Sequence, residues 1–290
     1  MAGNTNNILL IGATGLIGGH LTTALRPDHE AGTARVRVTA RSEESKAKVE
    51  AMGLEPLAFD LEKYQGFDQA FEGIDTIFLL RPYTIRYMMQ NKQVVDAAKR
   101  AGVSHIVTLS AYAREETPFS VMGWQIIVDD YIANSGLGWT HLRPNFIMDN
   151  MIAQRDAASA TIFNRLTVPV SWLSSDDIAD VGAAVLRDPA AHNKKAYPLC
   201  AEVATIPEIA DHFAALTGVP HKHVVPPTDH VMARLLAQGR EPIYAEALVD
   251  YITAINDGRV PEVADTFDTV EQILGRPHLD WPTFLKKRLG

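Results

Sequence analysis

The sequence predicts an α/β protein of the Rossmann type, in which a doubly wound parallel sheet is followed by a smaller, mostly helical C-terminal lobe. Strand and helix signals alternate through the first half of the chain, as a parallel sheet with crossover helices requires. A glycine-rich turn joins the first strand to the first helix. Beyond Pro144 the alternation gives way to mainly helical segments.

The glycine-rich turn is the most informative of these features. Residues 8–11 are apolar and form a short run suited to a strand buried on both faces, and residues 16–25 have a helical pattern. Between them, Gly12 would let the chain turn, Gly15 would let the backbone approach a pyrophosphate, and Gly18 would let the helix pack closely on the sheet. Phosphates would bind free N–H groups at the helix N-terminus. The turn therefore predicts a dinucleotide site, and a turn without a ligand is the alternative.

The end of the second strand predicts which dinucleotide is bound. Residues 36–40 alternate in polarity and end at Arg41. A site for NAD usually has an acidic residue here, which accepts a hydrogen bond from the ribose 2′-hydroxyl. A guanidinium can instead bind a 2′-phosphate or stack on adenine. We therefore favour NADP over NAD, with a surface arginine that binds no ligand as the alternative.

Short apolar runs and glycines define the other elements of the first half. Each further strand is a short apolar run, and each helix ends at a glycine, which readily takes the left-handed conformation of a helix C-terminus. The expected strands are 55–59, 76–80, 105–109 and 139–143, and the expected helices are 43–52, 67–72, 84–101 and 121–135.

The second half carries helix-capping signals. Ser174 and the acidic turn after it predict a helix that runs to Arg187, and Thr205 with Glu208 has the spacing of a capping box. A strand is expected over 197–200, and the chain after residue 226 is mostly helical.

These elements predict two domains. We expect a dinucleotide-binding domain over 1–150, to which 170–202 return, and a substrate-covering lobe over 151–169 and 203–290.

Composition excludes several classes of function. The net charge of −8 argues against binding to nucleic acid or to an anionic membrane. The single cysteine, Cys200, excludes an internal disulfide and a CxxC metal site. The histidines show no metal-ligand spacing either, so we expect no bound metal. We expect the Cys200 thiol to be buried and inert. No apolar run approaches the ~18 residues of a membrane span, and the polar start shows no signal peptide. A cytoplasmic protein is expected, with a homodimer left open.

Taken together, the motifs show that the chain resembles the NmrA-like branch of the atypical short-chain dehydrogenases/reductases. The matching segments span nearly the whole chain: Gly-Ala-Thr-Gly-Leu-Ile-Gly at 12–18, Arg41, Asp60-Leu61, the strand residues 78–80, Ser-Gly-Leu-Gly-Trp-Thr-His-Leu-Arg-Pro at 135–144, Phe-Ile-Met-Asp-Asn at 146–150, Ile-Ala-Asp-Val at 178–181 and Leu-Gly-Arg-Pro at 274–277.

The resemblance implies a role for each matched position. Family members include triphenylmethane-dye and quinone reductases, some imine reductases, and non-catalytic redox sensors that regulate transcription. The implied cofactor contacts are Gly12, Ala13, Thr14, Gly15, Leu16, Ile17 and Gly18 at the pyrophosphate, Arg41 at the 2′-phosphate, Asp60 and Leu61 at the adenine, Leu80, Arg81 and Pro82 at the nicotinamide ribose, and Ser110, Pro144, Asn145 and Phe146 near the nicotinamide.

The usual acid of short-chain reductases is missing. These enzymes use a Tyr whose pKa is lowered by a Lys four residues later, and an alignment through residues 129–132 puts Val121 and Gln125 at those positions. Valine has no proton to give, and an amide has no charge to lower the pKa of a phenol. Hydride transfer itself needs only a cofactor and a substrate held close together in a dry pocket. We therefore expect an NADPH-dependent reductase of a conjugated, weakly polar small molecule such as a quinone, an imine or iminium ion, or a dye.

The remaining site residues are aromatic or able to donate a hydrogen bond. We take Ser110, Tyr112 and Gln125 as the catalytic candidates, because Ser110 or Tyr112 could donate a hydrogen bond to substrate. Two alternatives stay open: a non-catalytic NADP-binding sensor that engages a protein partner, and a ketone reductase that uses Tyr112 as its acid. The expected substrate pocket contains Tyr83, Tyr112, Trp124, Phe146, Met148 and Met151, which could equally be core and rim residues.

Overall fold

The computed structural model describes residues 5–63, 65–114, 117 and 120–290, and the chain divides into two compact units. The first, here called the sheet unit, comprises Met1–Ser110, Trp124–Arg143 and Ile178–Tyr197. The second, here called the C-terminal unit, comprises Ala111–Gly123, Pro144–Asp177 and Pro198–Gly290.

The sheet unit is built on a seven-stranded sheet. Its strands are β1 (Asn6–Ile11), β2 (Ala34–Ala40), β3 (Glu55–Ala58), β4 (Thr76–Leu79), β5 (His105–Leu109), β6 (Gly138–Pro144) and β11 (Lys195–Leu199). They lie in the order β11-β6-β5-β4-β1-β2-β3, and the pairings from β3 across to β6 are parallel. The order reverses beside β1, and ligands of such sheets bind outside the carboxyl ends of the strands at this point.

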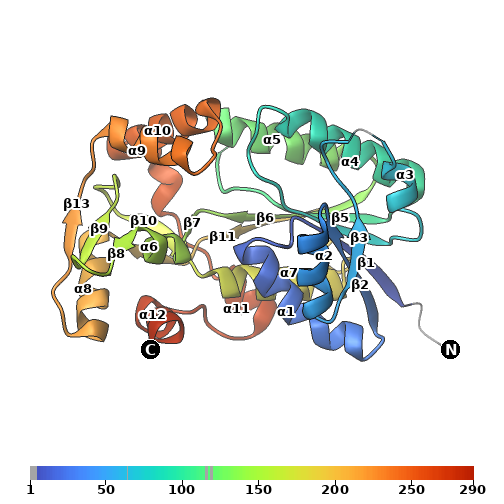
Figure 1. The fold of residues 1–290 in the computed structure, drawn as a ribbon, viewed down its shortest axis with the longest axis horizontal. Coiled ribbons are helices and arrows are strands. Elements are labelled where there is room, and N and C mark those ends of the chain that lie inside the picture. The colour runs from blue at the N-terminus through green and yellow to red at the C-terminus, as the bar shows by residue number, and fades with distance from the viewer. Residues whose placement is uncertain (1–4, 64, 115–116, 118–119) are drawn as a thin grey trace. The chain divides into compact units, whose positions relative to one another are not determined.

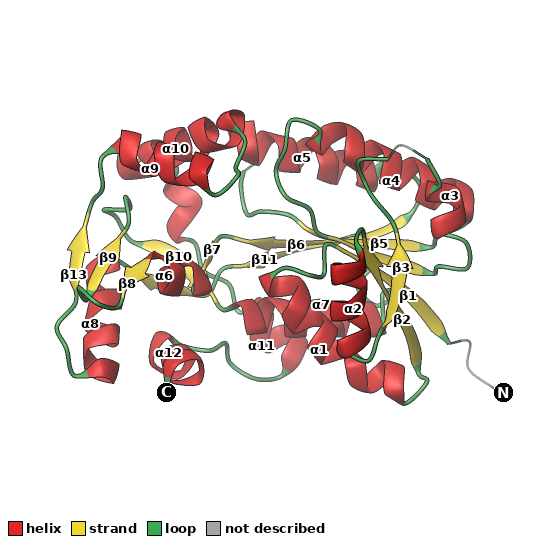
Figure 2. Ribbon diagram, in the orientation of Figure 1, coloured by secondary structure: helices red, strands yellow, loops and turns green. Residues whose placement is uncertain are grey.

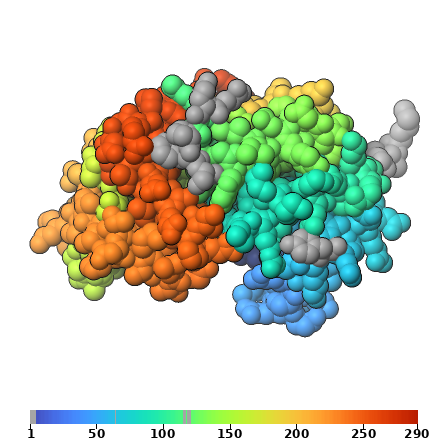
Figure 3. All heavy atoms as spheres, turned by 90° about the horizontal axis from the view of Figure 1, so that it is seen from above, coloured from blue at the N-terminus to red at the C-terminus, as the bar shows by residue number. Residues whose placement is uncertain are grey.

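Helices cover both faces of this sheet, as a doubly wound fold requires. In Figures 1 and 2, α3 (Phe67–Ala70), α4 (Tyr87–Ala101) and α5 (Ser120–Ala133) lie on one face, and α1 (Leu16–Glu30), α2 (Glu43–Ala51) and α7 (Ser175–Arg187) lie on the other. Figure 3 looks onto the face covered by α4 and α5, drawn in cyan to green. The fold class predicted from the sequence is confirmed.

Most predicted elements are present within a few residues of their expected ends, and α1 differs most. The prediction ends this helix at residue 25, and Pro27, which cannot donate a backbone hydrogen bond, follows two residues later. The helix nevertheless continues to Glu30. Its last turn is held by backbone hydrogen bonds from Ala31 to the Pro27 carbonyl and from Thr33 to the Asp28 carbonyl.

The C-terminal unit contains two small sheets as well as helices. One sheet has the strand order β12-β10-β7 and the other β13-β9-β8. The strands are β7 (Phe146–Ile147), β8 (Arg155–Asp156), β9 (Thr161–Phe163), β10 (Val170–Leu173), β12 (Glu202–Ala204) and β13 (Lys222–Val224), and the helices are α6 (Asp149–Gln154), α8 (Ile206–Thr217), α9 (Thr228–Ala237), α10 (Pro242–Asn256), η1 (Pro261–Ala264), α11 (Thr269–Leu274) and α12 (Trp281–Leu289).

The sequence predicts a mostly helical lobe and does not predict the two small sheets that these strands form. They are too short to show a periodic pattern, so the sequence alone does not reveal them. β10 pairs with β7 and β12 rather than with the large sheet, which is why residues 144–150 and 170–177 belong to the C-terminal unit instead of the sheet. The capping signals at Ser174 and Thr205 are confirmed, since both side chains accept a hydrogen bond from the third residue after them.

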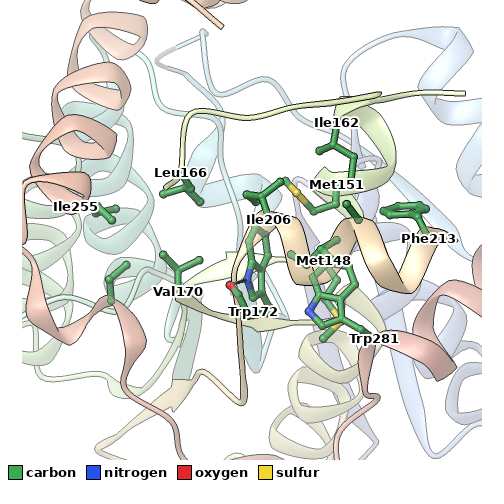
Figure 4. Close-up of a cluster of buried hydrophobic side chains, with 14 of the residues drawn as sticks. Met148, Met151, Ile162, Leu166, Val170, Trp172, Ile206, Phe213, Ile255 and Trp281 are labelled. Atoms are coloured by element: carbon green, nitrogen blue, oxygen red, sulfur yellow. Dashed lines mark hydrogen bonds between the residues drawn. The ribbon is translucent and has the colours of Figure 1, made fainter. Parts of the chain in front are cut away.

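The C-terminal unit has its own apolar core, shown in Figure 4. Trp172 of β10 lies at its centre, with its ring centroid 5.5 Å from that of Trp281 and 5.3 Å from that of Phe146. The Trp172 Nε1–H donates a hydrogen bond of 3.0 Å to the carbonyl of Ala204. Trp172 and Trp281 are fully buried, so this core gives the unit a tertiary structure of its own. No helix among the described residues is long and apolar enough to cross a membrane.

Candidate functional site

The glycine-rich turn after β1 has the geometry that its spacing predicts. Gly12 has φ +83°, and a Cβ there would lie 1.9 Å from the carbonyl oxygen of Leu80. A Cβ on Gly18 would lie 2.3 Å from Cα of Ala13, so α1 packs against the turn at this glycine. A Cβ on Gly15 would meet only the Gly12 carbonyl oxygen, at 3.9 Å. The fold itself therefore requires Gly12 and Gly18, whereas the space at Gly15 is open for a ligand.

The N-terminus of α1 is suited to an anion. Gly15 is its N-cap, and no side chain caps the first turn. Thr14, Gly15 and Leu16 are exposed, while Ala13 and Ile17 are buried. Exposed N–H groups at a helix N-terminus bind phosphate well, because the helix dipole adds to their hydrogen bonds. The turn thus fits the pyrophosphate of a dinucleotide, with Ala13 and Ile17 able to contribute only their backbone.

A hollow of about 530 Å³ lies at the carboxyl ends of β2 and β3. Arg41 follows β2 and is exposed at its rim, and Asp60 follows β3. Lys63 lines the same hollow, although no motif in the sequence marks this position. Leu61 is not part of this lining and packs against the apolar core of the sheet unit. Two cations at one hollow suit a ligand that carries a phosphate.

The residues after β4 lie next to the glycine-rich turn. The backbone N–H of Leu80 donates a hydrogen bond of 3.0 Å to the carbonyl of Ile11, which precedes Gly12. Pro82 is exposed, but the side chain of Arg81 is only 8% exposed. Arg81 therefore extends into the protein rather than towards solvent.

Gln125 of α5 connects two tyrosines. Its amide accepts a hydrogen bond from the hydroxyl of Tyr87 and donates one to the hydroxyl oxygen of Tyr83. Tyr87 stacks on Tyr83, with 5.2 Å between ring centroids, and on Trp124, with 6.4 Å. Three of the predicted site residues, Tyr83, Trp124 and Gln125, thus form one cluster at the carboxyl end of β4.

Ser110 is engaged in a buried ionic cluster. Its hydroxyl donates a hydrogen bond of 2.9 Å to Asp129, and the Arg143 guanidinium lies 2.8 Å from the same carboxylate oxygen. Burial raises the pKa of Asp129 to about 6, although the Arg143 charge acts in the opposite direction. Ser110 is itself only 6% exposed, so its hydroxyl holds α5 against β5 rather than pointing to an open site.

The pKa of Asp129 predicts a pH-dependent stability. Below pH 6 the folded protein holds a proton here that the unfolded chain, with a carboxyl pKa of 3.8, has already lost. The free energy of unfolding should therefore fall by about 2 kcal/mol between pH 4 and pH 6 from this group. Urea unfolding across this range should show a fall that is smaller by this amount in Asp129→Asn than in the wild type, and the remaining fall comes in part from Glu202, whose pKa burial raises to about 7. The control is Asp130→Asn, at the exposed neighbouring residue, which should keep the pH dependence of the wild type. The same pH dependence of unfolding in the wild type and in Asp129→Asn would contradict the raised pKa of Asp129.

Tyr112 lies in the C-terminal unit, and its hydroxyl is hydrogen-bonded to a carboxylate. Its hydroxyl donates a hydrogen bond of 2.7 Å to Asp265, and its ring meets Phe267 edge-on at 5.4 Å. Burial and the Asp265 carboxylate both raise the pKa of Tyr112 well above its usual value. A phenol with a raised pKa is a weaker acid, so this environment works against Tyr112 as the acid of a ketone reductase.

The other predicted residues of the C-terminal unit have mainly structural contacts. Pro144 is buried, the Asn145 amide donates to the Val263 carbonyl at 2.7 Å, and Phe146 packs on Trp172. Met148 and Met151 are fully buried in the core of Figure 4. The Met151 sulfur also accepts a hydrogen bond of 3.7 Å from the Asn164 amide, so both methionines have contacts within this core, and their part in a substrate pocket stays a prediction.

Cys200 is buried, as the sequence predicts, and burial raises the pKa of its thiol to about 12. In the part of the chain that the structure describes, no group of three or more His, Cys, Asp or Glu residues is arranged to hold a metal ion.

Comparisons with known proteins agree with this fold. The NAD(P)H azoreductase of Xenophilus azovorans is 28% identical over 292 residues, which cover 96% of each chain. The NADPH-dependent quinone oxidoreductase of Escherichia coli, solved with NADPH, has a TM-score of 0.82 at 21% identity, covering 98% of this chain and 100% of that one. The triphenylmethane reductase of Citrobacter sp., solved with NADP(H), has a TM-score of 0.79 at 22% identity and the same coverage. The model of the NmrA-like family matches residues 4–276, and the chain therefore belongs to the NmrA-like family.

Proposed function

We propose that this protein is an NADPH-dependent reductase of a conjugated, weakly polar small molecule. The observation that carries the proposal is the arrangement within the sheet unit of the open turn at Gly15, the uncapped N-terminus of α1 and the hollow at Arg41. The azoreductase, quinone oxidoreductase and dye reductase named above support the substrate class, because each name specifies a conjugated acceptor.

The residues of the sheet unit would divide the cofactor between them. Backbone N–H groups of the turn would bind the pyrophosphate, and Arg41 with Lys63 would bind the 2′-phosphate. Asp60, at the same hollow, would contact the adenosine. The bound cofactor would supply a hydride, and the protein's part would be to hold the acceptor beside it and to exclude water.

The substrate class follows from the groups at the usual acid positions. Val121 and Gln125 cannot form a Tyr–Lys pair, and the hydroxyls of Ser110 and Tyr112 already donate to carboxylates. An acceptor that delocalises the incoming electron pair needs less acid help than an isolated ketone. A conjugated quinone, imine, azo compound or dye meets this condition.

Binding of NADPH against NADH tests the cofactor assignment. We expect the wild type to prefer NADPH, and Arg41→Ala to weaken NADPH binding by about 1.5–3 kcal/mol, as loss of a charge-assisted contact should. NADH binding should hardly change, because NADH has no 2′-phosphate. Fluorescence titration measures both. Lys48→Ala, an exposed α2 lysine paired with Glu44, is the control and should behave like the wild type.

The outcomes separate the rival functions. Equal affinity of the wild type for NADPH and NADH would mean that Arg41 does not bind the 2′-phosphate. If the wild type binds neither cofactor, the proposed reductase function is refuted. Tight binding of one redox state with no turnover of any quinone, imine or dye would favour the non-catalytic sensor.

A further inference from the structure

A four-residue turn after β3 borders the hollow that Arg41 lines. The backbone N–H of Lys63 donates a hydrogen bond of 3.1 Å to the Asp60 carbonyl, which closes the turn. The Asp60 carboxylate accepts a second bond, of 3.0 Å, from the N–H of Glu62. A bond from a backbone N–H to the Asp side chain two residues before it stabilises a tight turn. The backbone of residues 60–63 is therefore defined by its own hydrogen bonds.

The side chains of this turn extend to three different places. Lys63 lines the hollow, and Leu61 packs against the apolar core of the sheet unit. Glu62 reaches α4, where it accepts a hydrogen bond of 2.8 Å from the Gln90 amide and pairs with the Arg86 guanidinium. Gln90 is itself only 3% exposed. One attachment point of the turn is thus fixed inside the protein.

The contact of Glu62 with α4 is suited to orienting the turn. The Glu62 and Arg86 side chains are 45% and 52% exposed, and ion pairs this exposed contribute little to stability. The contact nevertheless fixes the backbone one residue before Lys63. A lysine loses side-chain freedom when it binds a ligand, so a fixed backbone beneath it lowers the total cost of ordering.

Lys63 and Arg41 are both available to a ligand. Neither side chain has an ion pair among the residues that the structure describes. In contrast, Arg35 and Arg100 of the same unit each pair with a carboxylate at 2.7 Å. The hollow therefore presents two positive charges that the protein itself does not neutralise, and an anion is the ligand that suits them.

We propose that Glu62 is a positioning residue for the cofactor: by fastening the turn to α4, it holds the Lys63 ammonium at the hollow, where this ammonium and Arg41 bind the 2′-phosphate. The inference rests on the proposed NADPH-dependent function. It adds the residue that sets how tightly the 2′-phosphate is bound without contacting it.

Charge and position predict opposite effects for the loss of Glu62. Without its carboxylate the region would be less negative, and the Arg86 charge would lose its partner, so a purely electrostatic role predicts tighter binding of a phosphate. A positioning role predicts weaker binding, because Lys63 would no longer be held at the hollow. The direction of the change therefore distinguishes the two roles.

Fluorescence titration with NADPH and with NADH gives the test. Glu62→Ala should bind NADPH about fivefold more weakly than the wild type and NADH equally well, and Lys63→Met should lose about tenfold for NADPH alone. Gln90→Met, a neutral change at the buried partner, should show the same selective loss as Glu62→Ala. Asp68→Ala is the matched control, because it removes a carboxylate that pairs with Arg100 of α4 but does not line the hollow, and it should keep both affinities.

A double variant tests whether Glu62 acts through Lys63. In the Lys63→Met protein, the added change Glu62→Ala should cause no further loss of NADPH binding. A further loss there would overturn the positioning role. NADPH binding by the single variant Glu62→Ala that equals or exceeds that of the wild type would also overturn it, while the NADPH preference of the wild type would stand.

Amide hydrogen exchange gives a readout that needs no cofactor. Nuclear magnetic resonance should show the Lys63 amide exchanging about tenfold faster in Glu62→Ala than in the wild type, because the turn loses its attachment to α4, and unchanged in Asp68→Ala. Equal exchange in the wild type and Glu62→Ala would overturn the inference whichever dinucleotide binds. A wild type that binds neither dinucleotide would instead refute the proposed function, and with it the role of Glu62 in cofactor binding.

Discussion

Gly12→Ala should lower the free energy of unfolding by on the order of 4 kcal/mol, the largest effect that we expect from a single methyl group in this protein. The added Cβ would lie 1.9 Å from the Leu80 carbonyl oxygen, and φ at this residue is +83°, where side chains are strained. The Leu80 carbonyl and the Gly12 backbone that would carry the Cβ lie at the ends of neighbouring strands, so neither can move aside cheaply. Urea unfolding without any ligand measures the loss.

Gly15→Ala should leave the free energy of unfolding almost unchanged and abolish NADPH binding. Its added Cβ would meet only a carbonyl oxygen at 3.9 Å, so the free energy of unfolding should stay within about 0.5 kcal/mol of the wild type. NADPH binding should nevertheless be lost, because the Cβ fills the space expected for the pyrophosphate. Gly19→Ala, one turn into α1 with nothing within 4 Å of the added Cβ, is the matched control and should keep both properties. Normal NADPH binding by Gly15→Ala would contradict the proposal that the pyrophosphate binds at this turn.

Trp172→Ala should destabilise the C-terminal unit by about 3–5 kcal/mol. The side chain is fully buried between Phe146 and Trp281, and its removal would leave a cavity that the surrounding strands and helices cannot close. Urea unfolding followed by far-ultraviolet circular dichroism measures this loss.

The two central tryptophans should respond differently to a smaller change. Trp172→Phe loses the hydrogen bond to the Ala204 carbonyl, so we expect a loss of about 2 kcal/mol. Trp281 Nε1 has no hydrogen-bond partner among the described residues, so Trp281→Phe removes an unsatisfied buried N–H and should cost less than about 1 kcal/mol. A larger loss of stability for Trp281→Phe than for Trp172→Phe would contradict this difference between the two indole N–H groups.

Local sequence patterns predicted the architecture and the shape of the glycine-rich turn. The apolar run of β1, the glycines at 12, 15 and 18, and the capping signals at Ser174 and Thr205 each act over a few residues, so the sequence alone shows them. The strands β7, β8, β9, β10 and β12 were missed because two to four residues carry no readable period. Lys63 was missed because only the folded chain brings it to the hollow that Arg41 lines.

The sequence by itself determined the doubly wound sheet, the family and the turn suited to a dinucleotide, because these depend on residues close together in the chain. The tertiary structure alone decided what the candidate side chains contact. It enclosed Met148 and Met151 in a core, paired Ser110 with Asp129 and Tyr112 with Asp265, and joined Gln125 to Tyr83 and Tyr87. A side chain's chemistry depends on its burial and on neighbouring charges, and those neighbours come from distant parts of the chain.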